Sequence, residues 1–316
     1  MYENTEMRTV LADLLAEEMR KNPDVVIVDS DLARAHNTLA MKKEFPDRAL
    51  DVGIAECNMA SVAAGLASYG FKPFIYSFAP FASRRICDQI AISIVYAEQN
   101  VKIVGSDPCL AAEMNGATHM AVEDVGVLRS LPGMVIFEPV DGDQLAAAFP
   151  AIMAYEGPMF IRLFRKVPPA TIFADPDYKF DLFKADLLKE GADVSLFATG
   201  IEVKEALEAA EILAAEGISA EVINVHTIKP VDKETVLASV KKTGCAVSCE
   251  NHNIIGGLGS AISEVLISEY PVPMEFIGMR DHFSEVGKAP YLQKLYKMDA
   301  ASIAEAAKAV IQKKNK

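Results

Sequence analysis

The sequence lacks a long apolar run, and this absence bears on where the protein works. Its 316 residues contain no stretch of about 18 apolar residues, which is close to the minimum for a membrane-spanning helix. Residues 1–20 carry charges throughout and have no apolar core of the kind found in signal peptides. We therefore expect a cytoplasmic protein with no membrane partner.

Basic residues are also scarce. Lys and Arg number 31 against 44 Asp and Glu, which gives a net charge of -13. Nucleic acids and anionic membranes are bound through basic surfaces, so the sequence predicts neither as a partner. An anionic ligand would have to meet a local group of cations, for which the candidates are Arg84, Arg85, Arg162, Arg165 and Lys166.

Cysteines are few and are not spaced as metal or disulfide motifs. The five cysteines, at positions 57, 87, 109, 245 and 249, form no C-x-x-C pair and no even-numbered framework. This pattern indicates reduced thiols and predicts no metal site within this chain.

What the sequence does contain is an alternation of strand-like and helix-like segments. Apolar runs rich in β-branched residues predict strands, and apolar residues every three or four positions predict helices between them. This alternation indicates parallel sheets with helices on both faces. The predicted strands are 25–28, 101–104, 135–137, 160–163, 194–198, 221–225, 246–248 and 274–277, and the predicted helices include 9–19, 60–69, 85–97, 203–215 and 260–268.

The alternation is interrupted once, by a proline-rich stretch. Val167-Pro-Pro169 and Asp175-Pro176-Asp177 lie in a segment without apolar periodicity, which is typical of an interdomain linker. We therefore expect an α/β protein of two parallel or mixed-sheet domains. Their expected limits are residues 1–167 and 190–316, with a linker at 168–189.

Glu56 is the most conspicuous polar residue of the first domain. It lies in the run Asp51–Met59, at the predicted join between a strand and a helix of small residues. A buried carboxylate without a partner is costly, so Glu56 needs either backbone donors at the helix start or a nitrogen of a cofactor. The sequence by itself leaves both interpretations open.

Several further segments carry a resemblance to a known family. They are Gly53–Glu56 with Met59, Lys72–Phe74, Phe78–Phe81, Gly116–His119, Glu123-Asp124, Leu128–Pro132, Pro139–Gly142, Arg162–Arg165, Glu250–His252 and Gly256–Gly259. In this order and spacing, over nearly the whole chain, the sequence resembles the C-terminal half of the transketolase family, as found when the enzyme is split into two subunits.

The resemblance implies a thiamine diphosphate enzyme. It implies a pyrimidine-binding domain followed by a transketolase C-terminal domain, and it places Glu56 against N1′ of the aminopyrimidine ring. Phe78 and Phe81 match the aromatic positions that pack on this ring, where an apolar face excludes water. Arg84 stands where many transketolases have Tyr.

The resemblance also implies a substrate site. His119 matches a histidine that touches the substrate and assists proton transfer, and Arg165 matches an arginine whose fork would bind a phosphate or a sulfonate. Asn115 stands in place of an Asp and Asp107 in place of a His. We expect both to contact substrate, and because an amide donates as well as accepts, the preferred sugar could be unusual.

One motif of the family is missing. Its diphosphate and magnesium site is a Gly-Asp-Gly followed by Asn, and the nearest match, Asp141-Gly142-Asp143, lacks the first Gly. The resemblance therefore implies that a partner, the N-terminal transketolase subunit, holds the diphosphate and Mg2+ in a heterotetramer, with self-association through the C-terminal domain. It implies transfer of a two-carbon ketol unit between sugar phosphates in carbohydrate metabolism, as in the pentose phosphate pathway.

Other functions share some of these features. The β subunit of a 2-oxoacid dehydrogenase has the same fold, Glu and cofactor, but the run Leu128–Pro132 favours transketolase. A transketolase specialised for an unusual sugar, a relative of deoxyxylulose phosphate synthase, and an assembly subunit without catalytic activity also stay open.

Overall fold

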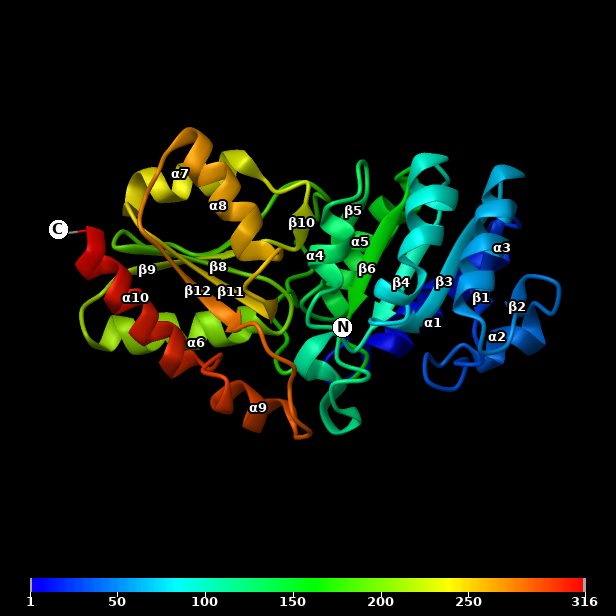
Figure 1. The fold of residues 1–316 in the computed structure, drawn as a ribbon, viewed down its shortest axis with the longest axis horizontal. Helices are drawn as coiled ribbons and strands as arrows, with labels where there is room; N and C mark the ends of the chain where they lie inside the picture. Colours follow the sequence, from blue (N-terminus) through cyan, green and yellow to red (C-terminus); the bar gives the residue numbers. More distant parts are fainter. Residues whose placement is uncertain (1, 315–316) are drawn as a thin grey trace. The chain divides into compact units, whose positions relative to one another are not determined.

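The computed structural model describes residues 2–314, and the chain divides into two compact α/β units (Figure 1). Unit 1 comprises the residues up to 108 together with 127–182. Unit 2 comprises 109–126 and the residues from 183 onwards. The expected fold class, two α/β domains with parallel or mixed sheets, is confirmed.

The sheet of unit 1 contains parallel strands in the order β5-β6-β4-β3-β1-β2. Strands β1, β4, β5 and β6 are buried at every position, as expected when helices cover both faces of a parallel sheet. The strands are β1 (Val25–Asp29), β2 (Ala49–Asp51), β3 (Lys72–Phe78), β4 (Lys102–Ser106), β5 (Val135–Phe137) and β6 (Met159–Leu163).

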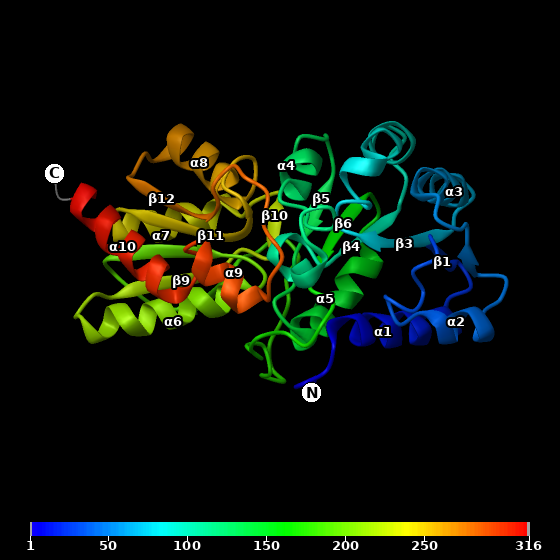
Figure 2. The ribbon, with the colours of Figure 1, turned by 60° about the horizontal axis from the view of Figure 1, so that its bottom comes forward.

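Helices lie on both faces of this sheet. Figure 2 shows α1 and α5 on one face and α3 on the other. The apolar side chains of α1 and α5 pack on strands β1, β3, β4 and β6 to form the core. The helical segments are α1 (Met7–Lys21), α2 (Leu39–Glu44), α3 (Glu56–Ser68), the 3-10 turn η1 (Arg84–Ile86), the π-helix η2 (Gln89–Tyr96) and α5 (Gly142–Ala154), and α4 (Asp124–Arg129) spans the return of the chain to unit 1.

The predicted helix 85–97 of unit 1 contains two other helix types in place of the α-helix. The segment 85–97 was expected to be a single α-helix, but the chain forms a 3-10 turn followed by a π-helix. At the end of the π-helix, Gln99 N donates to Ile94 O, five residues back.

The sheet of unit 2 is mixed. Its strands lie in the order β12-β11-β8-β9-β7, and only β7 is antiparallel to its neighbour. Figure 2 shows α7 and α8 on one face and α6 and α10 on the other. The elements are η3 (Cys109–Asn115), β7 (Asp186–Lys189), β8 (Val194–Ala198), α6 (Glu202–Ala215), β9 (Ala220–Asn224), β10 (Thr227–Lys229), α7 (Lys233–Thr243), β11 (Ala246–Asn253), α8 (Leu258–Glu269), β12 (Met274–Met279), α9 (Ala289–Leu295) and α10 (Ala300–Lys314).

The segment between the last strand of unit 1 and the first strand of unit 2 is irregular. Residues 164–185 contain no helix or strand, and β7 begins at Asp186. The domain limits 1–167, 168–189 and 190–316 stand as a proposal. Within residues 2–314, no helix combines the length and apolarity needed to cross a bilayer.

Candidate active site

The carboxyl ends of the parallel strands of unit 1 gather several polar side chains. Phe78, the last residue of β3, is in register with Ser106, the last residue of β4, which is in register with Leu163 of β6. Asp107 follows β4 directly, and Arg165 follows β6 by two residues. Ligands of open parallel α/β sheets bind at this edge, so the candidate site begins here.

Glu56 opens helix α3, where the helix dipole favours a negative charge. Its side chain is 7% exposed, and Arg85 Nη1 donates to its Oε1 at 2.7 Å. The Arg85 side chain is 44% exposed, and its guanidinium carbon lies 3.8 Å from the centre of the Phe81 ring. The partner that Glu56 needs is thus supplied by Arg85, which the sequence had indicated only as one of several candidate cations.

The two predicted aromatic residues lie together. The rings of Phe78 and Phe81 meet edge to face, with centroids 6.4 Å apart, and both side chains are only partly buried. Arg85 lies over the Phe81 ring, and the guanidinium carbon of Arg165 lies 5.1 Å from the centre of the Phe78 ring, so the two rings link the Glu56 pair to the end of β6.

Asp107 and Arg165 form a close ion pair. Arg165 Nε donates to Asp107 Oδ2 at 2.8 Å, and the backbone N of Arg165 donates to Oδ1 at 3.2 Å. The side chain of Asp107 is 1% exposed and that of Arg165 is 15% exposed. Burial raises the pKa of Asp107 above its usual value, and the charge of Arg165 opposes this shift.

A second arginine reaches the same place from α1. Arg8 Nη1 and Arg165 Nη1 both donate to the carbonyl oxygen of Ala35, at 3.0 and 3.2 Å. Arg8 is also paired with Glu6, whose Oε2 lies 2.6 Å from Nη2. No resemblance or spacing pointed to Arg8, because the convergence depends on the loop that carries Ala35.

His36 is buried beside this group. Its Nε2 is 2.9 Å from Ser106 Oγ, and its ring lies 5.2 Å from that of Tyr76 and 6.0 Å from that of Phe78. Burial, with the nearby positive charges of Arg165 and Arg8, lowers the pKa of His36 to about 3. The imidazole is therefore neutral at physiological pH.

Arg162 is not available to a ligand. Its side chain is 0% exposed, and Nη1 lies 2.7 Å from Glu138 Oε1, which is 4% exposed. Arg162 therefore forms a buried ion pair with Glu138 inside unit 1.

Asn115 and His119 belong to unit 2, where Asn115 is the last residue of η3 and His119 lies in the short loop that follows. Thr118 Oγ1 is 2.9 Å from His119 Nδ1, and Asn115 Nδ2 donates to Ala112 O at 3.0 Å. Asn115 is exposed and His119 is half-buried. The structure thus brings Asn115 and His119 together in unit 2, and Glu56, Phe78, Phe81, Asp107 and Arg165 together in unit 1.

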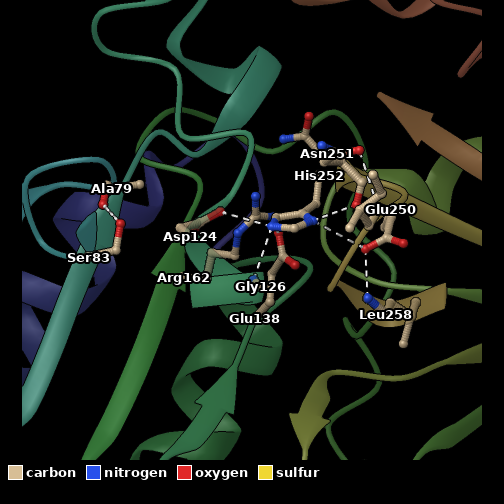
Figure 3. A network of polar contacts seen from close by, with 12 residues as sticks. Ala79, Ser83, Asp124, Gly126, Glu138, Arg162, Glu250, Asn251, His252 and Leu258 are labelled. Carbon is tan, nitrogen blue, oxygen red and sulfur yellow. Dashed lines mark hydrogen bonds and ion pairs between the residues drawn. The ribbon is translucent and has the colours of Figure 1, made fainter. Parts of the chain in front are cut away.

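The glycine-rich segment 256–259 of unit 2 serves a carboxylate of the same unit. Glu250 accepts the backbone N–H of Leu258 at 2.6 Å and that of Gly259 at 2.9 Å, so it caps the start of α8 (Figure 3). His252 Nε2 accepts from Gly126 N at 3.3 Å and its Nδ1 donates to Asn253 O. These donors are used within the unit, so the segment does not act as a dinucleotide loop.

The part of the chain that the structure describes holds no group of three or more His, Cys, Asp or Glu side chains able to bind a metal ion. In unit 1, the candidate site combines two buried carboxylates, Glu56 and Asp107, with the guanidinium groups of Arg85, Arg165 and Arg8.

Comparison with known proteins matches both parts of the chain. The family model for the transketolase pyrimidine-binding domain matches residues 3–169, and that for the transketolase C-terminal domain matches residues 183–303.

The sequences of individual relatives align with this chain over nearly their whole length. The chain is 51% identical to the 6-deoxy-6-sulfo-D-fructose transketolase subunit SqwH of Clostridium sp. (strain MSTE9), covering 98% of this chain and 95% of that protein. It is 34% identical to one of the subunits of the apulose-4-phosphate transketolase of Phocaeicola vulgatus, covering 97% of each chain.

Solved structures agree. One described as a split-gene transketolase, inactive β4 tetramer, superposes with a TM-score of 0.88 at 39% identity and covers 97% of this chain and 98% of that one. The transketolase of Pichia stipitis in complex with sedoheptulose 7-phosphate shares the fold, with a TM-score of 0.81 at 20% identity over 46% of its length.

Proposed function

The chain belongs to the transketolase family, and we propose that it is the catalytic C-terminal subunit of a split transketolase, transferring a two-carbon ketol unit from a ketose to an aldose. The observation that carries the proposal is the position of Glu56, a buried carboxylate at the start of α3 whose partner Arg85 lies over the ring of Phe81, which in turn meets Phe78 edge to face.

These residues fit thiamine diphosphate. Glu56 would share a proton with N1′ of the pyrimidine ring: its carboxyl form would donate to N1′ of the amino tautomer, and its carboxylate would accept from N1′–H of the imino tautomer, with lone pairs to spare for Arg85. Phe78 and Phe81 would pack on the ring and exclude water. The cofactor, when bound, supplies a carbanion at its thiazolium C2. We assign its diphosphate and Mg2+ to the N-terminal partner subunit.

We assign proton transfer at the substrate to His119. Thr118 Oγ1 lies against Nδ1 and fixes the orientation of the ring, and histidine exchanges protons near neutral pH. Asn115, at the end of η3 four residues before His119, offers an amide that can donate to or accept from a sugar hydroxyl.

The donor substrate that we favour carries a terminal anion. Arg165 and Arg8 converge from two elements on Ala35 O, and a guanidinium fork suits a sulfonate or a phosphate. Since the SqwH relative is named for 6-deoxy-6-sulfofructose, that ketose is our first candidate, with ketose phosphates such as xylulose 5-phosphate second and aldose phosphates as acceptors. Removing carbons 1 and 2 from the sulfosugar would leave a four-carbon sulfo-aldose.

We further propose that the chain acts only with its partner. The relative solved as a β4 tetramer is described as inactive, which supports self-association of this chain and a missing half of the active site. The active form would be a heterotetramer.

The test is ketol transfer by the co-purified complex with thiamine diphosphate and Mg2+. Each donor is offered with an aldose phosphate, and the shortened aldose and the extended ketose are both quantified. Transfer by the complex, with none by either chain alone, would support the proposal. A complex that binds thiamine diphosphate and transfers no ketol unit from any donor would overturn it.

A further inference from the structure

Each guanidinium of the proposed anion site already faces a carboxylate. Arg165 is paired with Asp107 at 2.8 Å, and Arg8 with Glu6 at 2.6 Å. The formal charge of these four side chains is therefore zero, although two arginines converge on one carbonyl oxygen.

The two carboxylates differ in burial. The side chain of Asp107 is 1% exposed, and that of Glu6 is 38% exposed. Water and salt screen an exposed charge far more than a buried one. Asp107 therefore dominates the repulsion that an incoming anion meets.

The backbone holds Asp107 in place. It lies directly after β4 with φ 50°, in the left-handed region that Asp tolerates better than most residues. Its N–H donates to Leu163 O and its carboxylate receives both the backbone N and Nε of Arg165. The carboxylate cannot turn away from Arg165 without losing these bonds.

The nitrogen Nη2 of Arg165 stays available as a donor. Nε is bonded to Asp107 and Nη1 to Ala35 O, and within residues 2–314 no acceptor takes a hydrogen bond from Nη2. An anion that bonds to Nη2 lies on the same guanidinium as the Asp107 carboxylate, so the two negative charges are close.

We propose that Asp107 is a specificity-determining residue that makes this site select singly charged terminal groups, such as a sulfonate, over doubly charged phosphate monoesters. A phosphate monoester carries between one and two negative charges at neutral pH, and a sulfonate carries one. The repulsion from a fixed carboxylate grows in proportion to the ligand charge, so Asp107 penalises phosphate more. This inference rests on the proposed function, since it takes Arg165 as the residue that binds the terminal anion.

The experiment measures binding rather than turnover. The complex with the partner subunit, loaded with thiamine diphosphate and Mg2+, is titrated by calorimetry with 6-deoxy-6-sulfoglucitol and with glucitol 6-phosphate. These sugar alcohols have no carbonyl group and cannot react with the cofactor. We expect the wild-type complex to bind the sulfonate more tightly.

Asp107→Asn removes one negative charge and keeps an acceptor for Arg165 Nε, at the cost of the bond from the Arg165 backbone N. We expect both ligands to bind more tightly, and the ratio of the two dissociation constants to move roughly tenfold towards the phosphate. Glu6→Gln should move the ratio in the same direction by less, because Glu6 is more exposed, and it provides a second measurement if Asp107→Asn impairs folding. Glu17→Gln, on the exposed face of α1, is the control that removes an equal charge elsewhere and should leave the ratio unchanged.

A ratio unchanged in both Asp107→Asn and Glu6→Gln, or a wild-type preference for the phosphate, would overturn the inference. A complex that shows the expected ratios of dissociation constants but no ketol transfer would uphold the inference and contradict the proposed function. Binding of neither ligand would remove Arg165 as the anion-binding residue and overturn the inference, while ketol transfer by the same complex would still uphold the proposed function.

Discussion

Arg85 and Glu56 form an ion pair of 2.7 Å in which the carboxylate is buried and the half-exposed guanidinium lies over the Phe81 ring, its carbon 3.8 Å from the ring centre. The contact joins the first residue of α3 to the turn η1. It sets the orientation of the carboxylate that we assign to the cofactor, and it fixes one of the two aromatic rings at the same time.

Glu56→Gln should lower ketol transfer by the complex by about two to four orders of magnitude, because an amide cannot share a proton with N1′ as a carboxylate does. The measurement is kcat with saturating thiamine diphosphate. Glu17→Gln serves as the control and should keep wild-type activity. A Gln variant with activity close to wild type would remove Glu56 from the mechanism.

Arg85 should act through charge and shape together. Arg85→Lys keeps the charge but loses the planar contact with Phe81, and Arg85→Gln loses both. We expect kcat to fall in the order wild type, Lys, Gln. Because Arg85→Gln leaves the buried Glu56 carboxylate without a cation, it should lower the free energy of unfolding by about 1–3 kcal/mol, and Arg85→Lys should lower it by less. A wild-type kcat in the Lys variant would contradict a role for the contact with Phe81.

Asp29 makes stability depend on pH. Burial raises its pKa to about 6, against the opposing N–H of Leu32 and charge of Lys42. The native state then binds a proton more tightly than the unfolded chain, so Asp29 costs nothing below about pH 4 and lowers stability progressively as pH rises to 6.

Asp29→Asn removes this cost and can still accept from Leu32 N. Relative to wild type, the variant should gain about 2 kcal/mol between pH 4 and pH 7. Urea unfolding of the chain at several pH values checks this. A difference that stays constant with pH, or that shrinks as pH rises, would contradict a raised pKa for Asp29.

Gly257 should tolerate no side chain. A Cβ there would lie 1.9 Å from Glu250 Oε2 and 2.6 Å from His252 Nδ1, so Gly257→Ala should destabilise unit 2 by about 2 kcal/mol or more. Gly65→Ala, in the exposed middle of α3 with no atom near its added Cβ, is the matched control and should stabilise by about 0.5–1 kcal/mol. Thermal unfolding of both variants decides the point; if Gly257→Ala melts at the wild-type temperature, the carboxylate is not tightly enclosed.

The long, buried elements were predictable because their signal is local. Strands such as β1 and β8 are continuous β-branched or apolar runs, and α1 and α6 repeat apolar residues at helical spacing. Four strands were missed. The strands β2, β7 and β10 have three or four partly polar residues, which form a strand only when a neighbouring strand pairs with them. The longer strand β3 contains Pro73, which counts against a strand when the sequence is read alone.

The sequence by itself determined the α/β alternation, the irregular segment after β6, and the place of Glu56 at a helix start, because each depends on neighbours along the chain. Only the tertiary structure decided that Arg85 is the partner of Glu56 and that Asp107 is the partner of Arg165. These partners are 29 and 58 residues apart, and ion pairs across such separations depend on strand order and register, which bring the ends of distant strands to one edge of the sheet.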